Sequence, residues 1–172
     1  MTPAAHVASI ALAMALGLML VELAVSRANE RVFRQRGAVD APDEVYPTMR
    51  WAYPAAFVVM ALEGMLIAPA PGAVTWLGLA AFVAAKALKA WAVVSLRRCW
   101  TYRVLVLPGM PLVRTGPYRF LRHPNYVAVL GELVGMAMLT SARITGPLLT
   151  LFFAWLLRQR IADEERALSL PR

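Results

Sequence analysis

Five blocks of apolar residues divide this chain and limit its possible folds more than any other feature. Sixty per cent of the 172 residues are hydrophobic and the mean hydropathy is +0.58, whereas only 16 per cent are charged. A soluble domain usually has about a quarter charged residues. The first three blocks approach the roughly 20 residues that cross a bilayer, and the last two have 15 and 14 residues. The blocks are residues 4–25, 51–67, 74–96, 126–140 and 144–157.

These blocks predict an all-α integral membrane protein with about five transmembrane helices in one domain, residues 1–172. The short turn at residues 141–143 joins the last two blocks, so we expect a C-terminal helical hairpin. Polar residues after the fifth block recur at helical spacing and predict a cytoplasmic tail helix to about residue 170. The expected helices are residues 4–25, 51–67, 74–96, 126–140 and 144–170.

Almost all arginines lie on one side of this predicted topology. Fifteen of them fall between the first two blocks, between the third and fourth blocks, or after the fifth, whereas only Arg143 falls on the other side. Because positively charged loops stay in the cytoplasm, we expect an outside N terminus and a cytoplasmic C terminus in the inner membrane. The net charge of +8 then reflects topology and contact with anionic membrane lipids, and no nucleic-acid partner is expected.

The run from Gly116 to Tyr126, GPYRFLRHPNY, is the strongest indication of a site. It places two arginines, a histidine, two tyrosines and an asparagine beside an apolar block, where such groups need water, protein or a polar ligand. Its prolines interrupt a regular helix and predict a shaped turn. The predicted hairpin brings the tail to the same membrane face. There Arg160 and Glu164 lie one helical turn apart, either as a surface ion pair or as part of the site.

Together these segments resemble the isoprenylcysteine carboxyl methyltransferase family of integral-membrane enzymes, and in particular its short bacterial branch. The resemblance depends on GPYRFLRHPNY, on Glu132 six residues later and on the tail RIADEE at residues 160–165. Membrane sterol reductases carry a similar RHPNY element, so the combination with the tail makes the resemblance specific. It extends upstream to residues 22–31, 37–39, 46–47 and 96–104 and thus covers nearly the whole chain.

The resemblance implies a methyltransferase that uses S-adenosylmethionine (SAM) without a Rossmann domain, and the sequence has no glycine-rich dinucleotide fingerprint. It implies that SAM lies at the cytoplasmic membrane edge, between the RHPNY turn and the C-terminal helix. Glu164 would hold a polar end of SAM, and Arg160, the implied catalytic residue, would face the methyl acceptor. The other implied cofactor-binding residues are Leu112, Val113, Tyr118, His123, Pro124, Asn125 and Tyr126.

No residue is identified as a dedicated general base. An ionised carboxylate or acidic enol needs alignment with the methyl group and no deprotonation. His123 is either a base for a less acidic hydroxyl or a hydrogen-bonding residue of the turn. The single cysteine, Cys99, and the two distant histidines predict neither a disulfide nor a metal site.

The expected acceptor is a lipophilic small molecule or prenylated substrate that enters from the bilayer. Its reacting group would be a carboxylate, as in isoprenylcysteine, or an acidic enol hydroxyl, as in an alkylpyrone. One alternative is an NADPH-dependent sterol-type reductase, which would carry a further C-terminal Lys-Tyr-Gly-type stretch. A phospholipid or amine methyltransferase and a non-enzymatic scaffold are the others. The sequence indicates no oligomeric state.

Some charged residues lie inside the apolar blocks, where a charge usually faces a partner or a cavity. Lys86 and Lys89 share a helix face, and we expect Glu63 or Glu132 to pair with one of them. Glu22 is near the cytoplasmic end of its block and is expected to reach water or a nearby arginine.

Overall fold

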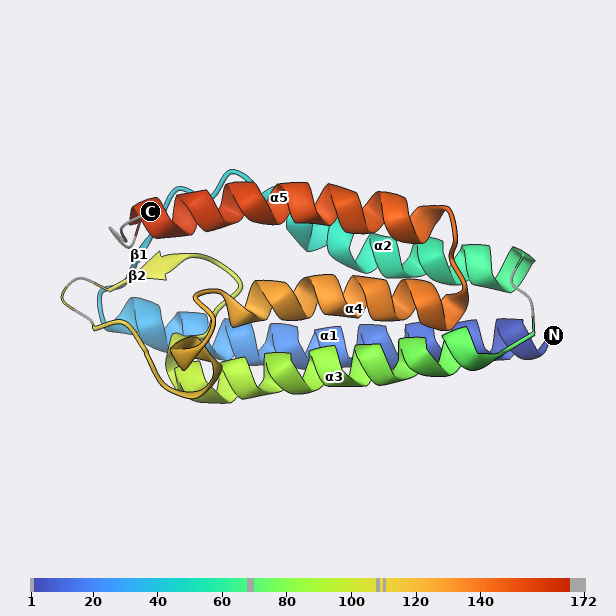
Figure 1. Ribbon diagram of the computed structural model, residues 1–172. Coiled ribbons are helices and arrows are strands. Elements are labelled where there is room, and N and C mark those ends of the chain that lie inside the picture. Colours follow the sequence, from blue (N-terminus) through green and yellow to red (C-terminus); the bar gives the residue numbers. More distant parts are fainter. Residues whose placement is uncertain (1, 68–69, 108, 110, 168–172) are drawn as a thin grey trace.

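Five α-helices make up most of the computed structural model, which describes residues 2–67, 70–107, 109 and 111–167 (Figure 1). Two short 3₁₀ helices and one pair of two-residue antiparallel strands complete the described part. The all-α prediction is confirmed, and the strand pair was not predicted. The elements are α1 (Pro3–Gln35), β1 (Val39–Asp40), α2 (Tyr46–Ile67), α3 (Ala73–Leu96), η1 (Arg97–Cys99), β2 (Leu105–Val106), η2 (Gly116–Arg119), α4 (Pro124–Thr140) and α5 (Thr145–Ala167).

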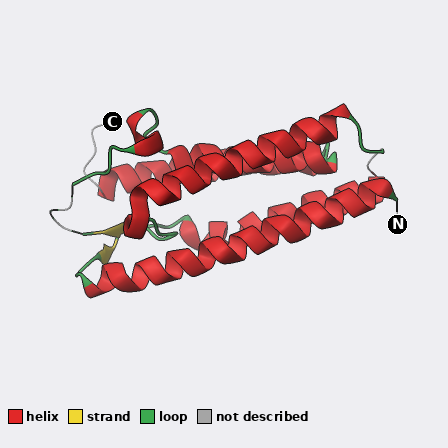
Figure 2. Cartoon of the chain, turned by 90° about the horizontal axis from the view of Figure 1, so that it is seen from below, coloured by secondary structure: helices red, strands yellow, loops and turns green. Residues whose placement is uncertain are grey.

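The helix axes are roughly aligned, with neighbours along the chain running in opposite directions, so the connections lie at the two ends of the molecule (Figure 1). The beginning of α1 and the short α2–α3 and α4–α5 connections lie at one end (Figure 1). Both strands, the longer α1–α2 and α3–α4 connections and the end of α5 lie at the other. Figure 2 shows the same separation from a second direction. The arginine-rich segments therefore share one end of the molecule, as the sequence predicts.

Within the part of the chain that the structure describes, three helices are long and apolar enough to cross a membrane, namely α1, α2 and α3 with its η1 extension. Many large apolar side chains point outward, including Leu66 at 80% exposure and Leu151 at 70%, as expected for a surface in contact with lipid. α4 has 17 residues and covers about 25 Å, less than the roughly 30 Å of a bilayer core. The protein is an integral membrane protein, and the number of five spans stays a prediction.

Two helices extend beyond their apolar blocks. α1 continues ten residues past its predicted end at residue 25, because its polar extension contains good helix formers up to the left-handed Gly37 (φ +88°). α2 begins at Tyr46, five residues earlier than predicted, and Asp43 accepts a hydrogen bond from the Tyr46 N–H at 3.0 Å. The predicted tail helix is present to Ala167, and residues 168–170 lie outside the described residues.

Aromatic and sulfur-containing side chains fill the core between α2, α3, α4 and α5. Phe57 and Phe153 are completely buried, and Tyr53 packs edge-to-face on both rings at centroid distances of 5.1 and 5.5 Å. Met60 and Met136 fill the space around them. Such a core fixes the positions of the helices that carry the site.

Glycines allow α3 and α4 to pack very closely. Gly131 and Gly135 lie one turn apart on α4, in the small-residue spacing typical of membrane helix pairs. A Cβ atom on Gly135 would lie 2.6 Å from the backbone nitrogen of Phe82 on α3. Gly78 of α3 would meet the α4 backbone in the same way. Any larger side chain would push the two helices apart.

Glu63 caps the start of α5. Its carboxylate accepts hydrogen bonds from the N–H groups of Ile144 and Thr145 at 2.9 and 2.8 Å and from the Thr145 hydroxyl at 2.5 Å. Free N–H groups and the positive end of the helix dipole favour a carboxylate there. The predicted alternative of Glu63 pairing with a lysine is therefore wrong.

Four charged side chains from α1, α3 and α4 neutralise one another inside the helix bundle. Lys86 lies 2.7 Å from Glu22 and 2.8 Å from Glu132, and Lys89 lies 2.7 and 3.3 Å from the same carboxylates. Tyr53 also donates to Glu132 at 2.8 Å. The predicted pairing of Glu132 is confirmed. Glu22 binds the two lysines rather than the predicted water or arginine.

Candidate functional site

The GPYRFLRHPNY run forms a compact turn that leads into α4. Residues 116–119 make η2, and Pro124 is the first residue of α4, where its missing N–H costs no helical hydrogen bond. Gly116 has φ +60°, and a Cβ atom there would collide with Ser95 on α3. Only glycine fits both the backbone conformation and this contact.

Two carboxylates at the end of α5 face this turn. The Tyr126 hydroxyl donates to Glu164 at 2.7 Å. His123 Nδ1 lies 3.7 Å from Glu164, and His123 Nε2 lies 3.2 Å from Glu165. The His123 and Tyr126 rings also stack, with centroids 5.6 Å apart. These contacts join the start of α4 to the tail of α5.

The carboxylates shift the titration of their neighbours. The nearby Glu164 carboxylate, assisted by Glu165, outweighs partial burial and raises the pKa of His123 above its ordinary 6.5. Burial alone would raise the pKa of Glu164, but the nearby His123 imidazole and the hydrogen bond from Tyr126 outweigh burial and lower that pKa below 4.5. Burial, with a smaller effect of Glu164, raises the pKa of the Tyr118 hydroxyl. At neutral pH the site thus contains an ionised Glu164 and a neutral Tyr118.

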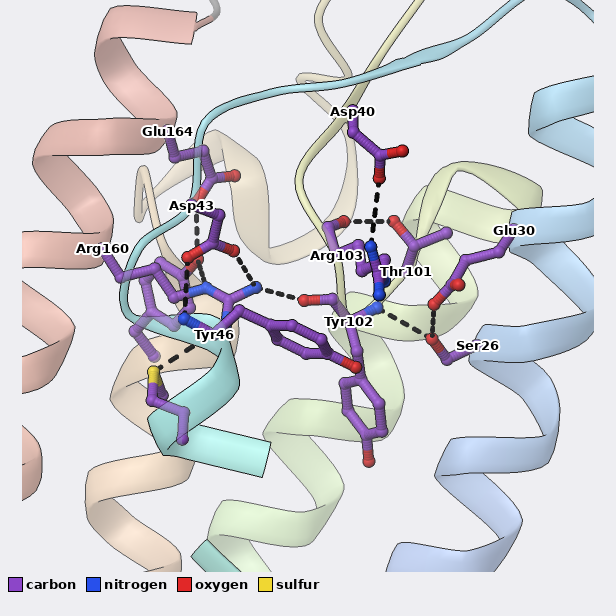
Figure 3. A network of polar contacts seen from close by, with 12 residues as sticks. Ser26, Glu30, Asp40, Asp43, Tyr46, Thr101, Tyr102, Arg103, Arg160 and Glu164 are labelled. Carbon is purple, nitrogen blue, oxygen red and sulfur yellow. Dashed lines mark hydrogen bonds and ion pairs between the residues drawn. The ribbon is translucent and has the colours of Figure 1, made fainter. Parts of the chain in front are cut away.

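Arg160 is buried in a polar network that involves three other segments (Figure 3). Its Nε donates to the Tyr126 hydroxyl at 3.1 Å, and one Nη2–H donates to the backbone carbonyl of Tyr102. Nη1 lies 3.7 Å from the sulfur of Met49. The guanidinium is therefore fixed in place by the loop between η1 and β2, by α4 and by α2.

Within the described residues, Arg160 makes its ion pair with Asp43 and not with Glu164. Asp43 Oδ2 lies 3.3 Å from Arg160 Nη2 (Figure 3), and the Tyr46 ring lies 5.4 Å from the guanidinium carbon. The alternative of a surface Arg160–Glu164 ion pair is wrong, because Arg160 is buried against Asp43 whereas Glu164 contacts Tyr126 and His123.

The loop that contributes Tyr102 is anchored to the polar extension of α1. The Tyr102 N–H donates to the Ser26 hydroxyl at 2.8 Å, and the Tyr102 hydroxyl donates to Glu22 at 3.1 Å. Asn29 donates to the carbonyl of Trp100 at 2.8 Å. This unexpected length of α1 thus positions the carbonyl that binds Arg160.

A cavity of about 860 Å³ lies between this loop, the turn and the tail of α5. Its size is within the usual range for small-molecule sites, roughly 300–1,000 Å³. Eight of the nine predicted site residues line it, and the ninth, Pro124, is buried at the start of α4. Their roles toward a cofactor stay predictions. The eight are Leu112, Val113, Tyr118, His123, Asn125, Tyr126, Arg160 and Glu164.

The cavity wall combines positive charge with an unused hydrogen-bond acceptor. The side-chain oxygen of Asn125 is buried and receives no hydrogen bond from the part of the chain that the structure describes. Buried polar atoms are nearly always paired, so this oxygen is available to a ligand donor. The arginines that line the cavity are Arg103, Arg114, Arg119, Arg122 and Arg160.

Sequence reasoning missed Asp43, Tyr102 and Glu165 as members of this site. Asp43 carries a local signal, since an aspartate three residues before a tyrosine-proline pair is typical of a helix N-cap. That signal predicts the start of α2 but not its contact with Arg160. Tyr102 contributes a backbone carbonyl, for which the residue type gives no indication.

The fold and site define an α-helical membrane protein with a ligand-sized polar cavity at the arginine-rich end of its helices. The sequence profile described as "Isoprenylcysteine carboxyl methyltransferase (ICMT) family" matches residues 76–170, more than half of the chain. The chain belongs to this family and is a membrane methyltransferase. The resemblance seen in the sequence is thereby confirmed.

Two bacterial relatives are similar over most of their length. An uncharacterized protein of Bacillus subtilis (strain 168), YpbQ, is 35% identical over 149 residues, which are 86% of this chain and 88% of the relative. An uncharacterized protein of Haemophilus influenzae is 24% identical over 162 residues, 94% of each chain. Both agree with a short bacterial branch of the family. No solved structure matches the chain.

Proposed function

We propose that this protein transfers the methyl group of SAM to an ionised oxygen of a lipophilic acceptor. The use of SAM is a general trait of the family to which the chain belongs. The observation that supports the proposal most is the single cavity around eight of the nine residues implied in cofactor and acceptor binding. Six of these residues lie within residues 112–126, whereas Arg160 and Glu164 come from α5, so the approach of the tail to the turn is not a result of sequence proximity.

The residues of the cavity fit the chemistry of SAM. Bound SAM supplies a methyl group on a positively charged sulfur, and it carries an ammonium and an adenine amino group as hydrogen-bond donors. Glu164, ionised and half-buried beside Tyr126, suits a cationic group. The side-chain oxygen of Asn125, which has no hydrogen-bond partner among the described residues, suits a donor. Leu112 and Val113 offer apolar contacts in the same wall.

The positive charge of the cavity suits an acidic acceptor better than an amine. Five lining arginines face one lining carboxylate, Glu164, among the described residues. An ionised carboxylate or enol needs no base, so the protein has only to align it with the methyl group. Such alignment is worth roughly 7–11 kcal/mol of barrier. His123 contacts a carboxylate with each ring nitrogen and has a raised pKa, which favours a linking role over that of a base.

We infer that the protein lies in the inner membrane and that its cavity opens to the cytoplasm. The arginine-rich loops and the end of α5 share the end of the molecule that contains the cavity (Figure 1). Under the positive-inside rule that end faces the cytoplasm. A lipophilic acceptor would then reach Arg160 from the bilayer, while SAM comes from the aqueous side.

Calorimetry of the purified protein in detergent tests the cofactor assignment. We expect SAM binding that Glu164→Gln weakens by about tenfold to a hundredfold, the effect of losing one charge-assisted hydrogen bond. Asp163→Asn is the matched control, because Asp163 is the adjacent carboxylate and bonds Arg166 instead. We expect wild-type affinity in this control. Unchanged SAM affinity in Glu164→Gln would contradict the assignment.

The acceptor is tested with methyl-labelled SAM in a lipid bilayer. We expect label transfer to a prenylated cysteine carboxylate or to an alkylpyrone enol, and none to the amine of phosphatidylethanolamine. Transfer to the amine alone would favour the phospholipid methyltransferase alternative. NADPH binding in place of SAM binding would favour the reductase, although membership of the methyltransferase family speaks against it.

A further inference from the structure

Asp43 is a buried carboxylate that lies just before α2. Its side chain is only 8% exposed. Oδ1 accepts the Tyr46 N–H at 3.0 Å, whereas Oδ2 makes no hydrogen bond within the described residues and lies 3.3 Å from Arg160 Nη2. One oxygen thus has a structural partner, and the other balances the charge of Arg160.

The contact with Asp43 is the loosest polar oxygen contact of Arg160. A guanidinium has five N–H donors. The Tyr126 hydroxyl and the Tyr102 carbonyl receive two of them, and both of these acceptors are fixed by α4 and by the loop anchored on α1. Charge-assisted N–H···O bonds are usually about 2.7–2.9 Å long. At 3.3 Å, and from a loop, Asp43 is the partner that can be exchanged most easily.

We propose that Asp43 is an internal stand-in for the acceptor's anionic oxygen and sets the requirement for a charged acceptor. The inference rests on the proposed function, in which Arg160 faces the acceptor. An ionised oxygen replaces Asp43 on the guanidinium and keeps the buried charge balanced. A neutral hydroxyl or an amine that displaced Asp43 would leave the guanidinium without a counter-charge, which is costly in the interior. Asp43 is therefore a specificity-determining residue.

The decisive variant is Asp43→Asn, which keeps size and the oxygen that caps α2 but removes the competing charge. The probe is dodecanoate, an acyl chain with one carboxylate, titrated into the protein in lipid nanodiscs. We expect Asp43→Asn to bind dodecanoate about tenfold more tightly than the wild type. We expect the KM for an ionised acceptor to fall to the same extent, with kcat within about twofold. Dodecylamine should show no gain.

Asp40→Asn is the matched control for the loss of one negative charge nearby. Asp40 is exposed on β1 and pairs with Arg34 at 2.7 Å and Arg103 at 3.5 Å, away from Arg160. We expect wild-type dodecanoate affinity in this control. Arg160→Ala gives the baseline of non-specific partition and should abolish the gain of Asp43→Asn in the double variant.

A purely structural Asp43 predicts the opposite result. Asp43→Asn would then lower the melting temperature and leave dodecanoate binding equal or weaker, and Asp43→Glu would restore both. Asp43→Ser, which also keeps a capping oxygen, repeats the test in a second variant. No gain in either variant, or loss of folding in both, overturns the proposal. SAM binding is measured separately by calorimetry. A protein that does not bind SAM but shows the dodecanoate gain in Asp43→Asn refutes the proposed function alone. A protein that binds SAM but shows no dodecanoate gain refutes only this inference.

Discussion

His123 lies between two carboxylates and connects the turn before α4 with the tail of α5. Its pKa is raised in the folded protein, so its contribution to stability is fully present below about pH 6.5 and is lost as the pH rises through the raised value. The pKa of Glu164 is lowered, so its contribution is present above about pH 4.5 and is lost as the pH falls through the lowered value. The connection is therefore strongest between about pH 4.5 and 6.5, where both contributions are fully present.

This pairing predicts a directly measurable titration. The chain has two histidines, so a His6→Gln variant leaves His123 as the single imidazole in an NMR titration. We expect its midpoint above 6.5, and a shift toward 6.5 in Glu164→Gln, because that variant removes the largest cause of the raised pKa. Asp163→Asn should leave the midpoint unchanged. A midpoint at or below 6.5 with both carboxylates intact would show that the contacts do not form.

Parts of the site that are local in the sequence could be predicted, whereas contacts between distant segments could not. The turn at residues 116–126 concentrates polar groups in eleven positions, so its place in the site could be predicted from local composition. The contact of Asp43 with Arg160 could not, because a single sequence contains no signal for a pairing between distant segments. Arg160 was predicted as a site residue, whereas the partners that hold it were not.

At the scale of elements, apolar blocks predict where helices exist better than where they end. α3 begins and ends at or next to its predicted bounds, because the turn residues Pro71 and Gly72 directly precede its apolar block. α1 runs past its block, since polar helix formers continue a helix and only Gly37 stops it. The hydropathy pattern therefore predicts where the chain enters and leaves the membrane, whereas capping residues predict where the helix ends.

The close α3–α4 contact predicts a large effect of one methyl group. In Gly135→Ala the new Cβ would lie 2.6 and 2.7 Å from the Phe82 backbone, so the helices must separate. We expect a loss of about 1–3 kcal/mol of stability and a lower melting temperature in detergent. Gly17→Ala on α1 is the control, because its added Cβ meets nothing within 4 Å. Equal melting temperatures for Gly135→Ala and Gly17→Ala would rule out this tight packing.

At the scale of the whole molecule, charge is distributed in two ways. Glu22, Glu132, Lys86 and Lys89 cancel one another between three helices, so the bundle interior carries no net charge from them. The arginines instead collect at the end that contains the cavity (Figure 1). The first arrangement stabilises helix packing in the membrane, and the second orients the molecule across it.

This distribution predicts which cysteines a membrane-impermeant thiol reagent reaches from outside the cell. In a Cys99→Ala background, Arg36→Cys and Gln159→Cys should be protected and Ala70→Cys should be labelled. These exposed positions belong to the α1–α2 connection, to α5 near its end and to the α2–α3 connection. The ends of α1 and α5 lie opposite the α2–α3 end of the molecule (Figure 1). Labelling of Arg36→Cys and Gln159→Cys from opposite sides would contradict the topology.

Arg143→Cys tests the α4–α5 hairpin separately. A helix of 17 residues crosses the bilayer only if its flanking residues also enter the membrane or if the bilayer becomes thinner there. Labelling from outside establishes five spans, whereas protection of Arg143→Cys beside a labelled Ala70→Cys means that the hairpin enters the membrane without crossing it.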